Sequence, residues 1–254
     1  MVDLADLHIN KFCEVFMTGD YYNSQRAVER AIEGVKGIVQ KSSGFNIEKI
    51  VFVVGNDVLN TDNIHKATTK GTAQDTDLHW YKAFKVGLDC YVSCVDYLLG
   101  FADVEVIHCP SNHDYITGTL LAETLAVYYR NHKNVTFQTG PKYRKYYQYH
   151  LNLIEFEHGD KGKPSTLPLA MANEVPQLWA NTKFRYCCLH HVHHQDVIKF
   201  QSSKDYIGVN VTYMRSPSPA DIWHFESDYV SLAAIEGQIY SKENGRVSHI
   251  THYF

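Results

Sequence analysis

The stretch IVFVVGND, residues 50–57, joins an uninterrupted run of β-branched and aromatic residues to a glycine, an amide and a carboxylate. A continuous apolar run of this length is typical of a strand covered on both faces, as in the sheets of α/β proteins. The polar residues begin where the expected strand ends. Because the carboxyl ends of strands in an open α/β sheet converge on one edge, residues 55–57 are candidates for a site at that edge.

Strand and helix patterns alternate on both sides of this run. Apolar residues recur at helical spacing from Arg26 to Gln40, and further helices are expected at residues 79–99, 120–130 and 166–179. Strands are expected at residues 2–5, 104–109, 135–137, 146–157, 185–189, 207–213, 229–235 and 247–253. Residues 60–78 are polar and predict a long loop, a kind of segment that often carries function. No convincing linker interrupts the pattern, so residues 1–254 are interpreted as one α/β domain.

The length and composition fit a globular enzyme. The chain has 254 residues, of which 44% are hydrophobic, enough for a sizeable core. No apolar run approaches the roughly 18 residues of a membrane span, and the first residues lack the charged and apolar blocks of a signal peptide. We therefore expect a cytoplasmic protein without membrane contact. The net charge of −4 excludes a general attraction to nucleic acid, so any such contact must be local.

The six cysteines are expected to be reduced thiols, because a chain of this length needs no disulfides and nothing points to secretion. Cys187 and Cys188 adjoin a histidine cluster, which raises a zinc or redox role as an alternative. Neither they nor Cys90 and Cys94 have Cys-x-x-Cys spacing. The favoured interpretation is therefore that they pack as small hydrophobic residues.

Five short segments carry Asp, Asn or His where expected strands end. They are Asp-Leu-His at residues 6–8, Gly-Asn-Asp at 55–57, Ser-Asn-His-Asp at 111–114, His-Gly-Asp at 158–160 and His-Val-His at 191–193. On an extended chain, residues i and i+2 face the same side, so Asp6 with His8, and His191 with His193, each aim two groups inward. Mixed carboxylate, imidazole and amide ligands suit Mn²⁺, Fe or Zn²⁺ better than Ca²⁺ or Mg²⁺. One such segment alone is a weak signal, usually a solvated turn; five together predict a metal site.

In their order, these segments resemble the calcineurin-like metallophosphoesterase superfamily. The pattern of that superfamily is Asp-x-His, Gly-Asp, Gly-Asn-His followed by Asp or Glu, a His, and Gly-His-x-His, and the match extends from residue 6 to residue 193. The first and third segments look most like the DNA-repair exonuclease branch. The resemblance implies a two-sheet β-sandwich flanked by helices and two bound divalent ions, with Mn²⁺ expected and Fe or Zn²⁺ as alternatives.

Residue by residue, the resemblance implies two ion sites that share a bridging carboxylate, Asp57. The implied ligands are Asp6, His8 and His193 for one ion, and Asn112, His158 and His191 for the other. A metal-bridging hydroxide would attack phosphorus in line. His113 is implied as the catalytic group that protonates the leaving oxygen rather than as a ligand, with Asp114 or a neighbouring carboxylate orienting it.

Three positions depart from the pattern of the superfamily. The second segment reads Gly-Asn-Asp, which displaces the carboxylate by one residue; Asp57 is assigned because Asn56 cannot supply a bridging negative charge. Ser111 and His190 stand where the superfamily has glycine. Glycine at such positions permits tight turns, so these substitutions predict a slightly different loop geometry.

Three substrate classes are considered, and the first of them is the expected one. The first is DNA, cleaved by a phosphodiesterase or exonuclease; the basic, tyrosine-rich segment 142–150, with Arg144 and Lys145, would hold the strand, unless it is an ordinary edge strand. The second is a small nucleotide-like phosphoester, with residues 60–78 as a lid. Arg215 and His224 are further candidates for substrate contact. The third is a non-catalytic scaffold, which would have no need of His113. The sequence leaves the oligomeric state open.

Overall fold

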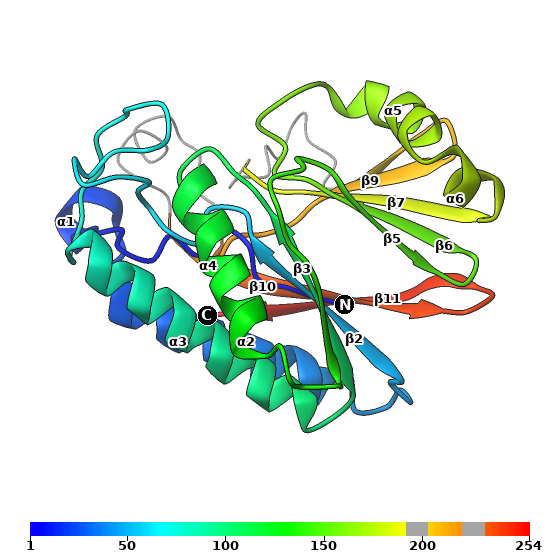
Figure 1. The fold of residues 1–254 in the computed structure, drawn as a ribbon, viewed down its shortest axis with the longest axis horizontal. Coiled ribbons are helices and arrows are strands. Elements are labelled where there is room, and N and C mark those ends of the chain that lie inside the picture. Colours follow the sequence, from blue (N-terminus) through cyan, green and yellow to red (C-terminus); the bar gives the residue numbers. More distant parts are fainter. Residues whose placement is uncertain (192–202, 220–231) are drawn as a thin grey trace.

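The computed structural model describes residues 1–191, 203–219 and 232–254, apart from the side chains of Met17 and Thr18. The elements form four layers: helices, a six-stranded sheet, a five-stranded sheet and a second group of helices (Figure 1). The expected fold class is confirmed at this level, a mixed α/β structure with two multi-stranded sheets flanked by helices. Among the described residues, no helix combines the length and the apolar character needed to cross a bilayer.

The first sheet has the strand order β11-β10-β1-β2-β3-β4. Its strands are β1 (Val2–Asp3), β2 (Lys49–Gly55), β3 (Asp103–Cys109), β4 (Val135–Gln138), β10 (Ala234–Ser241) and β11 (Gly245–Tyr253). The strands β1 to β4 run parallel, whereas β10 and β11 form an antiparallel hairpin beside β1. The carboxyl ends of β1, β2 and β3 therefore lie side by side at one edge.

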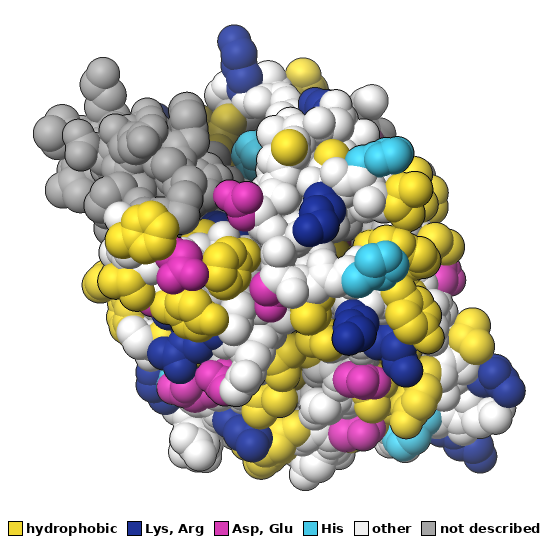
Figure 2. Space-filling model, turned by 90° about the vertical axis from the view of Figure 1, so that its left-hand side faces the viewer, with side chains coloured by type: hydrophobic (Ala, Val, Ile, Leu, Met, Phe, Trp, Pro, Cys, Tyr) yellow, Lys and Arg dark blue, Asp and Glu magenta, His cyan; other side chains and the backbone are white. Residues whose placement is uncertain are grey.

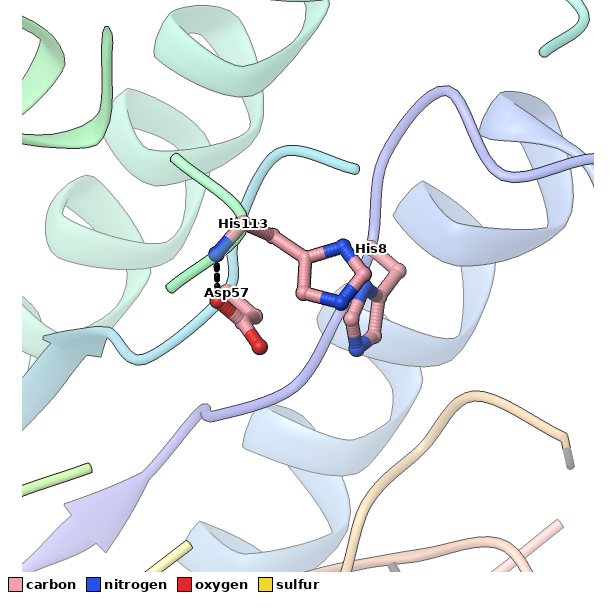
Figure 3. Close-up of side chains that lie close together, drawn as sticks. All are labelled: His8, Asp57 and His113. Carbon is pink, nitrogen blue, oxygen red and sulfur yellow. Dashed lines mark hydrogen bonds between the residues drawn. The ribbon is translucent and has the colours of Figure 1, made fainter. Parts of the chain in front are cut away.

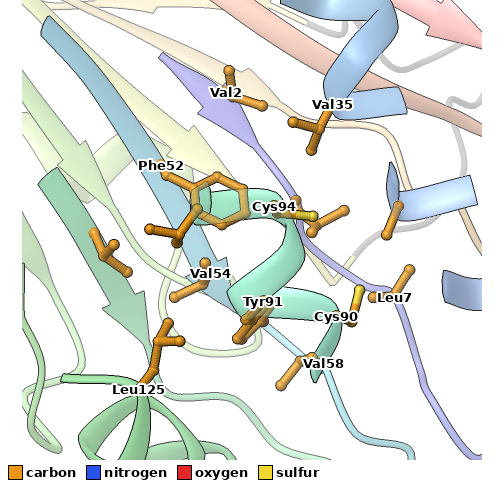
Figure 4. Packing of buried hydrophobic residues seen from close by; sticks show 14 of the residues in the cluster. Val2, Leu7, Val35, Phe52, Val54, Val58, Cys90, Tyr91, Cys94 and Leu125 are labelled. Atoms are coloured by element: carbon orange, nitrogen blue, oxygen red, sulfur yellow. The ribbon is translucent and has the colours of Figure 1, made fainter. Parts of the chain in front are cut away.

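The alternation of side chains along β2 explains its continuous apolar sequence. Ile50, Phe52 and Val54 pack against the helices, while Val51 and Val53 pack against the second sheet. Figure 4 shows Phe52 and Val54 among side chains of the facing helices. Because both faces are covered, each of these side chains is buried, and burial of one stabilises the fold by roughly 1.5–3 kcal/mol.

Four helices lie on the outer face of the first sheet or near its edge. They are α1 (Val15–Thr18), α2 (Ser24–Lys41), α3 (Trp80–Leu99) and α4 (Tyr115–Tyr128). The Asn23 side chain caps α2 by accepting a hydrogen bond from the Arg26 N–H. At the start of α4, the Asp62 carboxylate accepts from the Ile116 and Thr117 N–H groups. This second cap fastens the loop of residues 60–78 beside the carboxyl ends of β2 and β3.

The second sheet has the strand order β5-β6-β7-β9-β8. Its strands are β5 (Lys145–Tyr149), β6 (Asn152–Phe156), β7 (Phe184–Leu189), β8 (Ser203–Tyr206) and β9 (Val209–Tyr213). Ile154, Phe156 and Cys188 face the first sheet, whereas Leu153 and Leu189 face outward. The outer face is covered by α5 (Leu167–Glu174) and α6 (Pro176–Ala180), and the 3₁₀ turn η1 (Pro164–Thr166) precedes α5.

Several expected elements differ in their limits. The strand expected at residues 146–157 is the hairpin of β5 and β6, which turns at His150 with a φ of 49°. The helix expected at 166–179 divides at Val175, since the residue before Pro176 is disfavoured in the helical region. Strand β8 was not expected, because its sequence Ser-Lys-Asp-Tyr has no apolar alternation. Residues 229–231 of another expected strand lie outside the described residues.

All six cysteines are buried free thiols, as expected. Burial raises the pKa of Cys187 and of Cys188 well above the ordinary value. A raised pKa disfavours the thiolate that a metal ligand or nucleophile requires. These two residues therefore pack as small hydrophobic side chains in the cores on either side of β7.

Candidate metal centre

The loops that follow five strands converge at one edge of the two sheets. Asp6 and His8 follow β1, and Asp57 follows β2. Asn112 and His113 follow β3, His158 follows β6, and His191 follows β7. The His191 ring contacts His158, which in turn contacts Asn112. His193 lies outside the described residues.

The backbone at this edge is unusually rich in left-handed residues. Asp6, His8, Asn56, Asp57 and His191 have φ values of 50°, 48°, 47°, 64° and 67°. A left-handed conformation costs a residue with a side chain roughly 1–2 kcal/mol, although Asn, Asp and His tolerate it best. The loops after β1 and β2 hold each other, with Asp6 N–H donating to Asn56 O at 2.6 Å and His8 N–H to Asp57 O at 2.9 Å. Such strain is concentrated at functional sites in many proteins.

One group of side chains surrounds the Nε2 atom of His158. This nitrogen lies 2.7 Å from Asn112 Oδ1, 3.1 Å from Asp57 Oδ2 and 3.2 Å from His191 Nδ1. A single N–H can donate one good hydrogen bond, yet three electron-pair donors face it. The residues therefore fit a cation, which several nitrogen and oxygen ligands can share.

The charges of Asp57 and His158 are strongly linked. Burial lowers the pKa of His158, but the negative charge of Asp57 and the hydrogen bond to it outweigh burial and raise that pKa to about 9. Burial acts on Asp57 in the opposite sense, and the positive charges of His158 and His113 outweigh it, so the Asp57 pKa is held well below its ordinary value. In the absence of a cation, the pair is thus an ionised carboxylate facing an imidazolium. The proton on His158 Nε2 then occupies the position at which a metal would bind.

A second group comprises His8, Asp57 and His113, whose potential ligand atoms all lie within 4.8 Å of one another. Figure 3 shows the two imidazoles beside the Asp57 carboxylate. The rings meet edge to face with centroids 4.8 Å apart. Asp6 Oδ1 lies 4.0 Å from His8 Nε2. Asp57 thus belongs to both groups, and it is the residue for which the resemblance implies a bridging role.

The surroundings of His113 differ from the expectation that Asp114 orients it. The two oxygens of Asp114 accept hydrogen bonds from Ser111 Oγ at 2.6 Å and from Leu59 N–H at 2.8 Å. His113 Nδ1 instead lies 3.2 Å from the backbone oxygen of Asn60. Burial and the charge of Asp57 raise the pKa of Asp114 to about 7.

The side chains at two positions where the superfamily has glycine make specific contacts. Ser111 Oγ accepts a hydrogen bond from the Asp57 N–H at 2.6 Å. His190 is fully buried, with Nδ1 2.9 Å from Glu157 O and Nε2 3.1 Å from Asp3 Oδ1. Sequence reasoning expected only altered turns here. The sequence signal for these contacts was a side chain able to form hydrogen bonds at a turn position where glycine was expected.

Arg144 is occupied by acidic side chains. Its Nε lies 2.7 Å from Glu157 Oε2 and 3.5 Å from Glu155 Oε1, and its terminal nitrogen Nη1 lies 2.7 Å from Glu174 Oε1. These acidic side chains therefore occupy the guanidinium of Arg144. Figure 2 shows another side of the molecule, the left-hand side of Figure 1, where basic and acidic side chains are interspersed among hydrophobic ones.

The other residues proposed for substrate contact have internal partners or lie outside the described part. Lys145 is buried and donates to two backbone carbonyls at 2.9 and 3.0 Å. Arg215 Nε lies 3.9 Å from Glu236 Oε1. His224 is outside the described residues.

Comparison with known proteins adds no assignment. No protein-family model matches the chain, and no curated protein matches it. The functional interpretation therefore depends on the chemistry of the described site.

Proposed function

We propose that this protein is a metal-dependent phosphoester hydrolase with a calcineurin-like fold. The observation that carries the proposal is the position of Asp57, which is common to two groups of nitrogen and oxygen donors, one with His8 and His113 and the other with His158 and His191. A carboxylate shared by two groups is what a two-metal site requires. The two sheets flanked by helices support the fold assignment.

The donor sets fit two divalent ions, with Mn²⁺ proposed and Fe or Zn²⁺ as alternatives. Asp57 would belong to both sets. The other proposed ligands are Asp6, His8 and His193 for one ion, and Asn112, His158 and His191 for the second. When bound, such ions stabilise negative charge on phosphoryl oxygens and lower the pKa of a water molecule to near neutrality.

His113 is proposed to deliver a proton to the leaving oxygen. Its Nδ1 faces a backbone carbonyl of Asn60, which leaves Nε2 as the nitrogen that can exchange a proton with a substrate. Imidazole suits this task because it gains and loses protons near neutral pH. Its closeness to His8 and Asp57 also permits a ligand role, which a variant can distinguish.

For the substrate, a small nucleotide-like phosphoester is favoured over DNA. Arg144 and Lys145, the residues that would hold a strand, are occupied by carboxylates and backbone carbonyls. Nucleic-acid binding by a protein of net charge −4 needs a local basic surface. An exonuclease activity remains the second candidate, because the motifs look most like that branch.

Metal analysis coupled to a substrate panel tests the proposal. Protein freed of metal is reloaded with Mn²⁺, Fe²⁺ or Zn²⁺ and given aryl phosphodiesters, aryl phosphomonoesters, nucleotides, and labelled single-stranded and duplex DNA. We expect metal-dependent hydrolysis of a phosphodiester, lost in Asp57→Asn. Activity on nucleotides without DNA cleavage would identify the small-substrate class. Absence of hydrolysis with every metal and substrate would refute the hydrolase proposal.

A further inference from the structure

Asn60 contacts two imidazoles of the candidate centre. It lies three positions after Asp57 and is only 1% exposed. Its side-chain oxygen Oδ1 lies 3.2 Å from His8 Nδ1, and its backbone oxygen lies 3.2 Å from His113 Nδ1. The Asn60 N–H donates to Ile9 O at 2.8 Å, which fixes the residue beside the segment that carries His8.

These contacts determine which nitrogen of each ring carries the proton. A backbone carbonyl only accepts hydrogen bonds, so His113 Nδ1 must be the donor. The amide of Asn60 is oriented by its Nδ2, which donates to Asp75 O at 3.3 Å. Rotating the amide would bring its oxygen against that carbonyl, so Oδ1 faces His8 and His8 Nδ1 is also the donor. In a neutral imidazole the other nitrogen, Nε2, then carries the lone pair.

We propose that Asn60 is a positioning residue that holds both His8 and His113 in the Nδ1–H form, so that Nε2 of His8 can ligate a metal and Nε2 of His113 can serve the substrate. The inference rests on the proposed function. A partner that fixes the tautomer and ring orientation of a metal-binding histidine commonly changes metal affinity or activity 10–100-fold when it is removed. The loop of residues 60–78 takes part, since Asp75 orients the amide.

The contact with His8 comes from the Asn60 side chain and the contact with His113 from its backbone, so a substitution can remove the first and keep the second. Asn60→Ala removes the side-chain oxygen facing His8 and keeps the backbone oxygen facing His113. Asn60→Asp keeps an oxygen acceptor for His8 and loses only the Nδ2 donor to Asp75 O, so it tests the acceptor apart from the contact with the loop. Asn63→Ala is the matched control, because Asn63 lies in the same loop and its side chain contacts only neighbouring loop residues in the described structure.

Tautomers are read from long-range ¹H–¹⁵N correlation spectra of the imidazoles in metal-free and Zn²⁺-loaded protein, and Zn²⁺ affinity is measured by competition with a chelator. We expect His8 to lose its single Nδ1–H form in Asn60→Ala, with one Zn²⁺ bound about 10–100-fold more weakly. His113 should keep its Nδ1–H form in that variant. Asn60→Asp should restore the His8 signal, and Asn63→Ala should match the wild type in every readout.

Other outcomes overturn the inference or the function separately. Unchanged His8 signals and Zn²⁺ affinity in Asn60→Ala, with an active wild type, would overturn the role of Asn60 and leave the hydrolase intact. A wild type that binds Zn²⁺ with the expected tautomers but hydrolyses no phosphoester would refute the function and leave the positioning role. A wild type that binds none of Mn²⁺, Fe²⁺ and Zn²⁺ would overturn both. If Asn60→Ala fails to fold, the His8 tautomer in Asn60→Asp decides: loss of the Nδ1–H form there overturns the inference.

Discussion

The hydroxyl of Ser111 holds the backbone of Asp57, accepting its N–H at 2.6 Å and donating to Asp114 Oδ1 at 2.6 Å. Asp114 Oδ2 in turn accepts the Leu59 N–H. The turn that carries the shared carboxylate is thus tied to the turn that carries Asn112. The Ser111 hydroxyl therefore supports the candidate metal-binding groups.

Ser111→Ala removes this support. It leaves the Asp57 N–H without its buried acceptor, which costs roughly 1–3 kcal/mol in the free energy of unfolding. We expect that loss in urea denaturation of the metal-free protein, together with weaker metal binding. Ser93→Ala, at an exposed helix position where the hydroxyl bonds only a local carbonyl, serves as the control. Equal stability of the two variants would show that the hydroxyl is not a support.

Asp57→Asn tests the shared carboxylate directly. The change keeps the shape of the side chain and removes the charge that both donor groups need. We expect loss of bound metal and a fall in kcat/KM of more than about 100-fold, since removing even a supporting partner of a ligand costs 10–100-fold. Metal content by elemental analysis and turnover of an aryl phosphodiester check this. Asp89→Asn, on the exposed side of α3, is the control, and near-wild-type activity in Asp57→Asn would mean that the ligand set is wrong.

His113→Ala separates the two roles that the geometry permits for this residue. As a proton donor, His113 can be lost with metal retained and turnover reduced roughly 10²–10⁴-fold. As a ligand, its loss would remove metal together with activity. We expect the first result, because Nε2 is the nitrogen that does not face Asn60 O and other candidate ligands are available for each ion. Metal content and turnover are measured on one preparation of His113→Ala. His65→Ala, at an exposed position of the loop of residues 60–78, is the control.

The layers of this fold could be predicted because buried strands and helix faces are apolar in the sequence. The apolar run at residues 50–54 is continuous since alternate side chains face the helices and the second sheet. The gathering of Asp6, Asp57 and Asn112 follows from parallel pairing of β1, β2 and β3, which places their carboxyl ends at one edge. Strand ends and motif order were therefore sufficient for this part of the site.

Other features could not be predicted, because they depend on contacts between distant residues or on a turn without a sequence signal. His190 and Asp3 are 187 positions apart, and their pairing exists only after the two sheets have packed together. Asn60 reads as an ordinary polar loop residue, because its contact with His8 spans 52 positions. The turn at His150 adopts φ 49° without a glycine or Asn-Gly signal, so β5 and β6 were read as one strand. Tertiary packing decides each of these features.

The raised pKa of His158 gives metal binding a defined pH dependence. Below its pKa of about 9 the imidazole is protonated in the metal-free protein, so a metal must displace a proton. We expect the apparent affinity of the corresponding ion to rise by up to roughly tenfold per pH unit between pH 7 and 9 and to level off above that. Proton release on metal addition, measured by titration in two buffers of different ionisation enthalpy, checks this, and His158→Gln should abolish that component.

The raised pKa of His158 also predicts that the metal-free protein becomes less stable as the pH rises from 6.5 to 9. His158 has a folded-state pKa above its ordinary value of 6.5, so its contribution is fully present below pH 6.5 and is lost as pH rises toward 9. Thermal unfolding of the metal-free protein should therefore show Tm falling across this window, by more in the wild type than in His158→Gln. Saturating metal should invert the trend, because a cation takes the place of the proton. A Tm that falls equally in both proteins would show that the Asp57–His158 pair is not the source.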